Sequence, residues 1–398
     1  MTVAIKKDRI DFSAVHAAMQ AYVDKELLPG FSIAVTVGGE RVESHCCGWA
    51  DREADVALRE DHIFRLYSNT KLFTSAAALM LIEDGRLALD DPVARYLPAF
   101  ADMRVLRPGA TGLSDTEPAR IPITPRHLLT HTSGLLYDFT DPEHPICRDY
   151  VARRVRDPQA PIAEMVERLA GVPLAFQPGT AWDYSFGTDV VGGVIEAVTG
   201  RTLGEVLKER IFEPLGLEDT GFHVGEGKAD RLVRLYAGAD PADPLRPGLT
   251  PVTDPIFNEG LHRPRPWQSG GGGLLSTLGD MARFLDAMRP GREGLLKPET
   301  VRFVTENLLP AGLCVQFGAF GEWPGQGHSA ACGVMVDPAA GEHPASAGEC
   351  FWSGAAGTQW WFSPAHDFAV AIMTQRQNGA MHPFAAELKR LVYEAVVG

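Results

Sequence analysis

Residues 68–71 read Ser68-Asn69-Thr70-Lys71, which places a hydroxyl and an amine three positions apart. The flanking residues predict a helix, because Ile63 to Tyr67 lead into an apolar stretch from Leu72 to Leu81 that Gly85 ends. Side chains three positions apart share one face of a helix. We therefore expect Ser68 in the first turn of a buried helix, with the amine of Lys71 beside its hydroxyl.

Ser68 and Lys71 are candidates for a nucleophile and its base. The partial positive charge at a helix N-terminus favours a developing alkoxide, and a desolvated lysine can accept a proton at neutral pH. The alternative is that Ser68 caps the helix and Lys71 is a solvated residue of the first turn, because an isolated SxxK pattern often occurs by chance. The rest of the chain has to decide between these interpretations.

Composition indicates a globular protein with a large core. The chain has 398 residues, of which 45% are hydrophobic. Lys and Arg number 37 against 51 Asp and Glu, which gives a formal net charge of −14. This charge argues against a nucleic-acid partner or an anionic membrane surface, and no stretch is long enough to span a membrane.

The cysteines and the first residues favour a cytoplasmic protein. Six cysteines are too few for a disulfide scaffold and follow no metal-ligand spacing, so we expect reduced thiols and no metal. Met1 to Phe12 is charged and no apolar run follows it, which argues against a secretory signal. The sequence leaves the oligomeric state open, as a monomer or a homodimer.

The first part of the chain predicts a helix followed by a hairpin of strands, and the last part predicts strands followed by a helix. Gly38-Gly39 suits the tight turn of the first hairpin, and the apolar residues of the two helices recur at helical spacing. Both ends are therefore expected to form layers of one antiparallel sheet. The predicted elements are a helix from Phe12 to Val23, strands Phe31 to Val37, Arg41 to Cys47, Gln359 to Phe362 and Phe368 to Thr374, and a helix from Phe384 to Val396.

The middle of the chain is mostly helical in pattern, with long connections at Arg107 to Arg120 and Ala237 to Arg265. The expected fold class is α/β (α+β), with an antiparallel sheet flanked by the terminal helices and an inserted helical lobe. The expected division is a discontinuous α/β lobe, 1–98 and 300–398, and a mostly helical lobe, 99–299. A cleft between two lobes is a common place for a small-molecule site.

Two further segments can complete a catalytic site. Tyr184 follows a turn-rich stretch and precedes a predicted helix from about Asp189 to Val198. A phenol beside a lysine ammonium can relay a proton. The alternative, a core tyrosine whose hydroxyl is satisfied by a hydrogen bond, is more common for any single tyrosine. Trp352 to Thr358 enters a turn of small residues, where a backbone N–H can approach an oxyanion closely, although an ordinary hairpin turn has the same composition.

Other motifs point away from rival mechanisms. His127 and His131 lack a third ligand at a recognisable spacing, so we interpret both as structural. The run Gly270 to Gly273 lacks a following phosphate-binding lysine and predicts close backbone packing beside the cleft. The chain contains no GxSxG nucleophile elbow, HExxH helix or Walker loop.

The ordered set of an SxxK, a Tyr-Ser pair and a Trp-x-Gly turn resembles the serine β-lactamase and penicillin-binding-protein superfamily, and more closely the family VIII carboxylesterases related to class C β-lactamases. The resemblance covers nearly the whole chain. It implies that Ser68 is the nucleophile, Lys71 its partner and Tyr184 the general base and acid. It further implies an oxyanion hole of the backbone N–H groups of Ser68 and Ala355, and a substrate pocket lined by Tyr137, Trp352, Ser353 and Gly354.

Two departures from the β-lactamase pattern favour an ester over a lactam. Trp352-Ser353-Gly354 stands where those enzymes carry Lys-Thr-Gly or His-Thr-Gly, and Tyr184-Ser185-Phe186 replaces their Tyr-x-Asn. The expected function is a cofactor-free serine carboxylesterase acting on short-chain, uncharged esters. The alternatives are an acyltransferase, a D-amino-acid amidase or a weak β-lactamase with the same acyl-enzyme chemistry, and an inactive penicillin-recognising-type binding scaffold.

Overall fold

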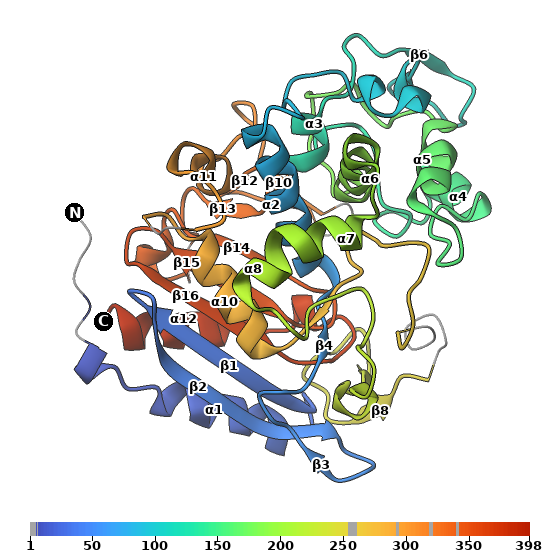
Figure 1. Cartoon of the computed structure of the whole chain (residues 1–398). Helices are drawn as coiled ribbons and strands as arrows, with labels where there is room; N and C mark the ends of the chain where they lie inside the picture. Colours follow the sequence, from blue (N-terminus) through green and yellow to red (C-terminus); the bar gives the residue numbers. More distant parts are fainter. Residues whose placement is uncertain (1–4, 6, 254–260, 292–293, 318–320, 340–341) are drawn as a thin grey trace.

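A single antiparallel sheet assembled from both ends of the chain organises the computed structural model (Figure 1). The structure describes residues 5, 7–253, 261–291, 294–317, 321–339 and 342–398. Eight described strands pair in the order β12-β13-β14-β15-β16-β1-β2-β3. Their bounds are β1 Gly30–Val37, β2 Glu40–Asp51, β3 Val56–Ala57, β12 Gln326–His328, β13 Gly333–Met335, β14 Cys350–Ser353, β15 Gln359–Ser363 and β16 Phe368–Met373.

The two ends of the chain meet at the pair of strands β1 and β16, which runs in register from Ser32 opposite Met373 to Val37 opposite Phe368. Every residue of both strands is buried. Helices α1 (Ser13–Asp24) and α12 (Phe384–Val396) pack together on one face of the sheet, and α10 (Leu278–Met288) contacts β1 and β16. Because helices cover both faces, these central strands read as continuous apolar runs rather than alternating ones.

The inserted part of the chain is built around two buried helices, α2 (Thr70–Glu83) and α6 (Gly187–Thr199), which pack against each other. Figure 1 shows the smaller helices around them, above the sheet. Their bounds are α3 Pro125–Leu129, α4 Pro145–Ala152, α5 Ile162–Ala170, α7 Leu203–Leu207, α8 Glu213–Leu215 and α11 Pro298–Thr305. Short two-stranded ribbons complete the connections: β4 Phe64–Arg65 with β9 Leu275–Ser276, β5 Arg104–Leu106 with β6 Thr116–Pro118, β7 Tyr236–Gly238 with β8 Leu249–Pro251, and β10 Val315–Gln316 with β11 Glu322–Trp323.

The expected fold class and the terminal elements are confirmed, with three differences of detail. Strand β2 continues to Asp51, beyond the predicted end at Cys47. The expected loop 107–120 contributes its residues 116–118 to the β5–β6 ribbon. In the connection 237–265 the structure describes the ribbon β7–β8, and residues 254–260 lie outside the described residues. The division into lobes 1–98 with 300–398 and 99–299 stays a prediction.

The sequence predicted Ser68 in the first turn of the α-helix, and this prediction is wrong. Ser68 lies in a 3₁₀ turn, Tyr67–Asn69, that runs directly into α2 at Thr70. The backbone of Tyr67, with a left-handed φ of 46°, prevents a regular α-helix from extending back beyond Ser68. No helix in the part of the chain that the structure describes is long and apolar enough to cross a membrane.

Candidate active site

The backbone on both sides of Ser68 is held firmly. The N–H of Leu66 donates to the carbonyl of Leu274 (2.9 Å), next to the pairing of strands β4 and β9. After the left-handed Tyr67, the side chain of Thr70 accepts a hydrogen bond from the N–H of Leu274 (3.0 Å). A non-glycine residue with positive φ costs of order 1–3 kcal/mol and persists where surrounding contacts enforce it. The Ser68 hydroxyl is thereby presented at a sharp turn.

Three predicted residues meet at the Ser68 hydroxyl. The Tyr184 hydroxyl lies 2.6 Å from Ser68 Oγ, and Lys71 Nζ lies 3.3 Å from the same oxygen. The ammonium of Lys71, which is only 3% exposed, also lies 4.6 Å from the centre of the Tyr184 ring. The spacing expected from the sequence, with Ser68 and Lys71 on one face and Tyr184 beside them, is therefore present.

Lys71 has two further acceptors besides Ser68. Its Nζ donates to the carbonyl of Gly271 (2.8 Å) and to the hydroxyl of Tyr137 (3.0 Å). An ammonium has three protons to donate, and the three acceptors match them. The arrangement suits a charged Lys71.

Asp189 is a site residue that the sequence analysis missed as such. It is 1% exposed, and its carboxylate accepts hydrogen bonds from Ser269 Oγ (2.5 Å), the N–H of Gly271 (3.1 Å) and the hydroxyl of Tyr137 (3.2 Å). Burial and the negative charge of Asp189 raise the pKa of Tyr137 well above its ordinary value. A carboxylate within the apolar helix that follows Tyr184 was the available signal, because a buried charge requires partners.

Tyr184 is oriented by a cluster of rings. The indole N–H of Trp352 points to the Tyr184 hydroxyl (3.4 Å), and the His131 ring lies 5.0 Å from the Tyr184 ring. His131 Nδ1 contacts Ser185 Oγ (3.0 Å), while burial lowers the pKa of His131 well below its ordinary value. His131 is thus an uncharged packing residue, and His127 forms a capping box with Thr124 at α3, as expected of structural histidines.

The turn after strand β14 lies against the backbone that precedes Ser68. Thr358 Oγ1 donates to the carbonyl of Leu66 (3.2 Å), and a Cβ at Gly354 would lie 2.2 Å from that carbonyl oxygen. Only glycine fits there. Neither the N–H of Ser68 nor that of Ala355 has a hydrogen-bond acceptor within the described residues. Ser353 lies at the end of β14, and Ala355 is exposed.

The Gly270 to Gly273 run packs closely beside the site, as predicted. A Cβ at Gly271 would lie 2.3 Å from Asp189 Oδ2 and 2.6 Å from the Tyr137 hydroxyl. Because Gly271 has no side chain, there is room for the Asp189 carboxylate and the Tyr137 hydroxyl at these positions. Across the described parts of the chain, no group of three His, Cys, Asp or Glu side chains is placed to hold a metal ion.

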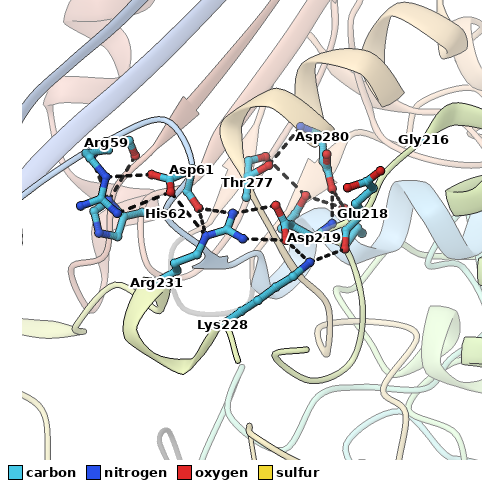
Figure 2. A network of polar contacts seen from close by, with 12 residues as sticks. Arg59, Asp61, His62, Gly216, Glu218, Asp219, Lys228, Arg231, Thr277 and Asp280 are labelled. Carbon is cyan, nitrogen blue, oxygen red and sulfur yellow. Dashed lines mark hydrogen bonds and ion pairs between the residues drawn. The ribbon is translucent and has the colours of Figure 1, made fainter. Parts of the chain in front are cut away.

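A network of charged side chains anchors the strand that leads to Ser68 (Figure 2). Asp219 pairs with Arg231 (2.6 Å) and Lys228 (2.6 Å), and Arg231 also donates to the backbone carbonyl of Asp61 (2.7 Å). The N–H of Asp219 donates to Asp280 in α10 (2.9 Å). The network joins the segment before β4 to the helix that packs on the sheet.

A fold of this kind, with a serine held between a lysine and a tyrosine at a helix N-terminus, defines a serine hydrolase of the β-lactamase type. The chain belongs to the Beta-lactamase family, whose model matches residues 15–394. The resemblance noted in the sequence is thereby confirmed.

Curated relatives and solved structures cover nearly the whole chain. Protein Rv1367c of Mycobacterium tuberculosis strain H37Rv is 34% identical over 371 residues, which is 90% of this chain and 88% of that protein. Esterase EstB of Burkholderia gladioli is 33% identical over 410 residues and covers 96% of each chain. The structure of EstCE1, a hydrolase with promiscuous acyltransferase activity, has a TM-score of 0.80 and 26% identity and covers 95% of this chain and 97% of its own.

Proposed function

We propose that the protein is a cofactor-free carboxylesterase that hydrolyses short-chain, uncharged esters through an acyl-Ser68 intermediate. The observation that carries the proposal is the position of Ser68 Oγ, 2.6 Å from the Tyr184 hydroxyl and 3.3 Å from Lys71 Nζ. A nucleophile within hydrogen-bond reach of a proton acceptor, which is itself oriented by a third group, is the arrangement that acyl transfer requires.

Tyr184 is the proposed general base and acid, and Lys71 its electrostatic partner. A charged Lys71 has no lone pair to accept a proton, whereas its charge and the Trp352 N–H both stabilise negative charge on the Tyr184 oxygen. In acylation the Tyr184 oxygen takes the Ser68 proton while Oγ bonds to the ester carbonyl carbon. Tyr184 then protonates the leaving alkoxide as the ester C–O bond breaks. In deacylation Tyr184 takes a proton from water as the water oxygen bonds to the acyl carbon. It returns the proton to Ser68 Oγ as the acyl C–Oγ bond breaks and the carboxylic acid leaves.

The oxyanion of each tetrahedral intermediate would accept hydrogen bonds from the free N–H groups of Ser68 and Ala355. Each such donor contributes about 3 kcal/mol to transition-state stabilisation. Trp352, Ser353 and Gly354 would line the substrate pocket. The indole of Trp352 stands where a lactamase carries a cation, which favours an uncharged substrate.

A second candidate function is acyl transfer from the same acyl-Ser68 to an alcohol or amine. The relative EstCE1, which is described as a hydrolase with promiscuous acyltransferase activity, supports this candidate. Chemically, only the acceptor of the deacylation step differs. Hydrolysis takes priority because the similarity to the esterase EstB extends over 96% of both chains.

Hydrolysis of 4-nitrophenyl acetate and butyrate by wild type and by Ser68→Ala tests the proposal. We expect the variant to lose the activity down to the uncatalysed background, and a phosphonate probe to label wild type at Ser68 only. Equal rates in the two proteins would refute the acyl-Ser68 mechanism. Wild type that neither turns over an ester nor reacts with the probe would identify a binding scaffold, whereas turnover of a cephalosporin in preference to esters would identify a β-lactamase.

A further inference from the structure

The β10–β11 ribbon brings two aromatic rings to the candidate active site. Phe317 directly follows β10, and Trp323 ends β11; their ring centres lie 5.0 Å apart. The N–H of Phe317 donates to the carbonyl of Gly321 (3.0 Å), which fixes its backbone to the start of the second strand. Phe317 and Trp323 are hereafter called the ribbon rings.

Phe317 packs against the ring cluster that surrounds Tyr184. Its ring centre lies 5.2 Å from that of Tyr184, 6.0 Å from that of Trp352 and 5.8 Å from that of Trp182. These separations are typical of direct aromatic contact. The ribbon rings therefore extend the aromatic surface formed by Tyr184, Trp352 and Trp182. These five rings are hereafter called the wall.

The wall changes from fully buried to half-exposed as it leaves Ser68. Trp182 and Trp352 are buried, whereas Phe317 and Trp323 both keep part of their surface open. On the other side of Tyr184, Phe139 stacks on Tyr137 with 4.8 Å between ring centres and is 51% exposed. Contiguous aromatic surface left open beside a reactive group is typical of a ligand site.

Charge lies beside Tyr184, where Lys71 Nζ is 4.6 Å from the ring centre, and beside Phe139, where Arg156 is 5.3 Å away, but the wall carries little at the ribbon. His328 packs edge-on against Trp352 (5.3 Å), and burial lowers the pKa of His328 to about 4, so its imidazole is neutral at pH 7. The nearest charged residue of the ribbon is Glu322, which precedes Trp323 and therefore points to the opposite face of the strand. At the ribbon rings, away from Lys71 and Arg156, a flat apolar ring could stack.

We propose that the ribbon rings form an apolar subsite that selects esters carrying an aromatic or similar ring. This inference rests on the proposed esterase function and names its substrate class more closely. The wall includes Tyr184, which serves both the acyl group and the leaving alcohol, so the ring can belong to either half of the ester.

Two pairs of esters test the subsite and assign it to one half of the substrate. Benzyl acetate against ethyl acetate places a ring on the alcohol, and ethyl phenylacetate against ethyl acetate places it on the acyl group. We expect wild type to prefer one ring-bearing ester, and Phe317→Ala to lower that preference in kcat/KM by about tenfold, the scale of one lost apolar contact in a pocket. Because Phe317 also packs on Tyr184, ethyl acetate turnover is measured for each variant, so that a general loss of activity divides out of the ring preference.

Phe303→Ala is the matched control, because Phe303 is another half-buried ring, packed on the core from α11, with no ring contact to Tyr184 among those described. It should leave the preference unchanged. If Phe317→Ala fails to fold, Phe317→Leu and Trp323→Leu retain apolar volume and give the same readout. Unchanged preference in both ester pairs in a folded variant would overturn the subsite alone. Absence of any ester turnover by wild type would instead overturn the proposed function.

Discussion

At the scale of single residues, Tyr137 links two buried charged side chains, those of Lys71 and Asp189. Its hydroxyl accepts from Lys71 and donates to Asp189, and both of those residues are almost fully buried. An uncompensated buried charge costs several kcal/mol, and a linked pair avoids most of that cost. Tyr137 was expected to line the substrate pocket; its hydroxyl gives it an electrostatic connection to Lys71 as well.

Tyr137→Phe keeps the ring and removes this connection. We expect kcat to fall by about ten- to a hundredfold, since Lys71 would be less well placed to stabilise the Tyr184 oxygen, with KM nearly unchanged. Steady-state kinetics on a short ester measures both constants. Tyr150→Phe is the control, because Tyr150 is also buried against Phe186 but has no hydrogen bond to Lys71 or Asp189 among the described contacts. An effect on KM alone would indicate that Tyr137 acts only as a pocket wall.

Asp183, next to Tyr184, makes stability depend on pH. Burial, and then the charge of Asp141, raise the pKa of Asp183 to about 7, and its buried Oδ1 has no partner in the described structure. Between pH 4 and 7 the folded protein holds a proton that the unfolded chain has released, so the free energy of unfolding falls as the pH rises through this window.

Asp183→Asn removes that dependence. Relative to wild type, the variant should gain stability between pH 4.5 and 7.5, by an amount on the order of 1–4 kcal/mol, and no more above pH 7.5. Urea unfolding of both proteins at several pH values measures the difference, in which the other titrating groups cancel. Parallel pH profiles would show that the carboxyl titrates normally.

At the scale of elements, the sequence predicts single helices and strands from local patterns, but it does not predict contacts between distant segments. The apolar residues of β1, the glycines of the turn after it and the spacing in α12 are local signals, and the sequence predicted both elements from them. Asp189 could not be assigned to the site, because Ser269, Gly271 and Tyr137 come from distant segments and only folding brings them together. The left-handed Tyr67 was equally hidden, since tertiary contacts enforce it.

The glycine run provides a test at this scale. Gly271→Ala would place a methyl group 2.3 Å from Asp189 Oδ2, so the carboxylate or the loop must move. We expect a loss of activity of at least about tenfold and a destabilisation of about 1–3 kcal/mol. Gly272→Ala is the neighbouring control, because the nearest atom to its added Cβ would be 3.8 Å away. Activity assays and thermal unfolding of the pair distinguish them, and equal behaviour would contradict the packing argument.

At the scale of the whole molecule, the network around Asp219 ties the segment before β4 to α10, the helix that packs on the sheet (Figure 2). Burial raises the pKa of Asp219, but the hydrogen bonds and charges of Arg231 and Lys228 together outweigh it and lower the pKa below its ordinary value of 3.8. The stabilisation it provides is therefore fully present at neutral pH and is lost as the pH falls below 4.

Asp219→Asn should lower the free energy of unfolding by about 1–3 kcal/mol at pH 7, because two cations lose their shared acceptor. The difference from wild type should shrink below pH 4. Asp240→Asn, which breaks the exposed pair with Arg246 at 3.5 Å, should change stability by less than about 0.5 kcal/mol. Denaturant unfolding at pH 7 and pH 3.5 compares the three proteins, and equal effects of the two substitutions would contradict a stabilising network.

The pairing of β1 with β16 also has a consequence for synthesis on the ribosome. Strand β1 ends at Val37, and its partner is complete only at Met373. At translation rates of about 5–20 residues per second, the nascent hairpin waits tens of seconds with an apolar strand edge unpaired. During that interval the chain depends on chaperones or on transient burial of β1, and a translational pause before β16 would lengthen its exposure to aggregation.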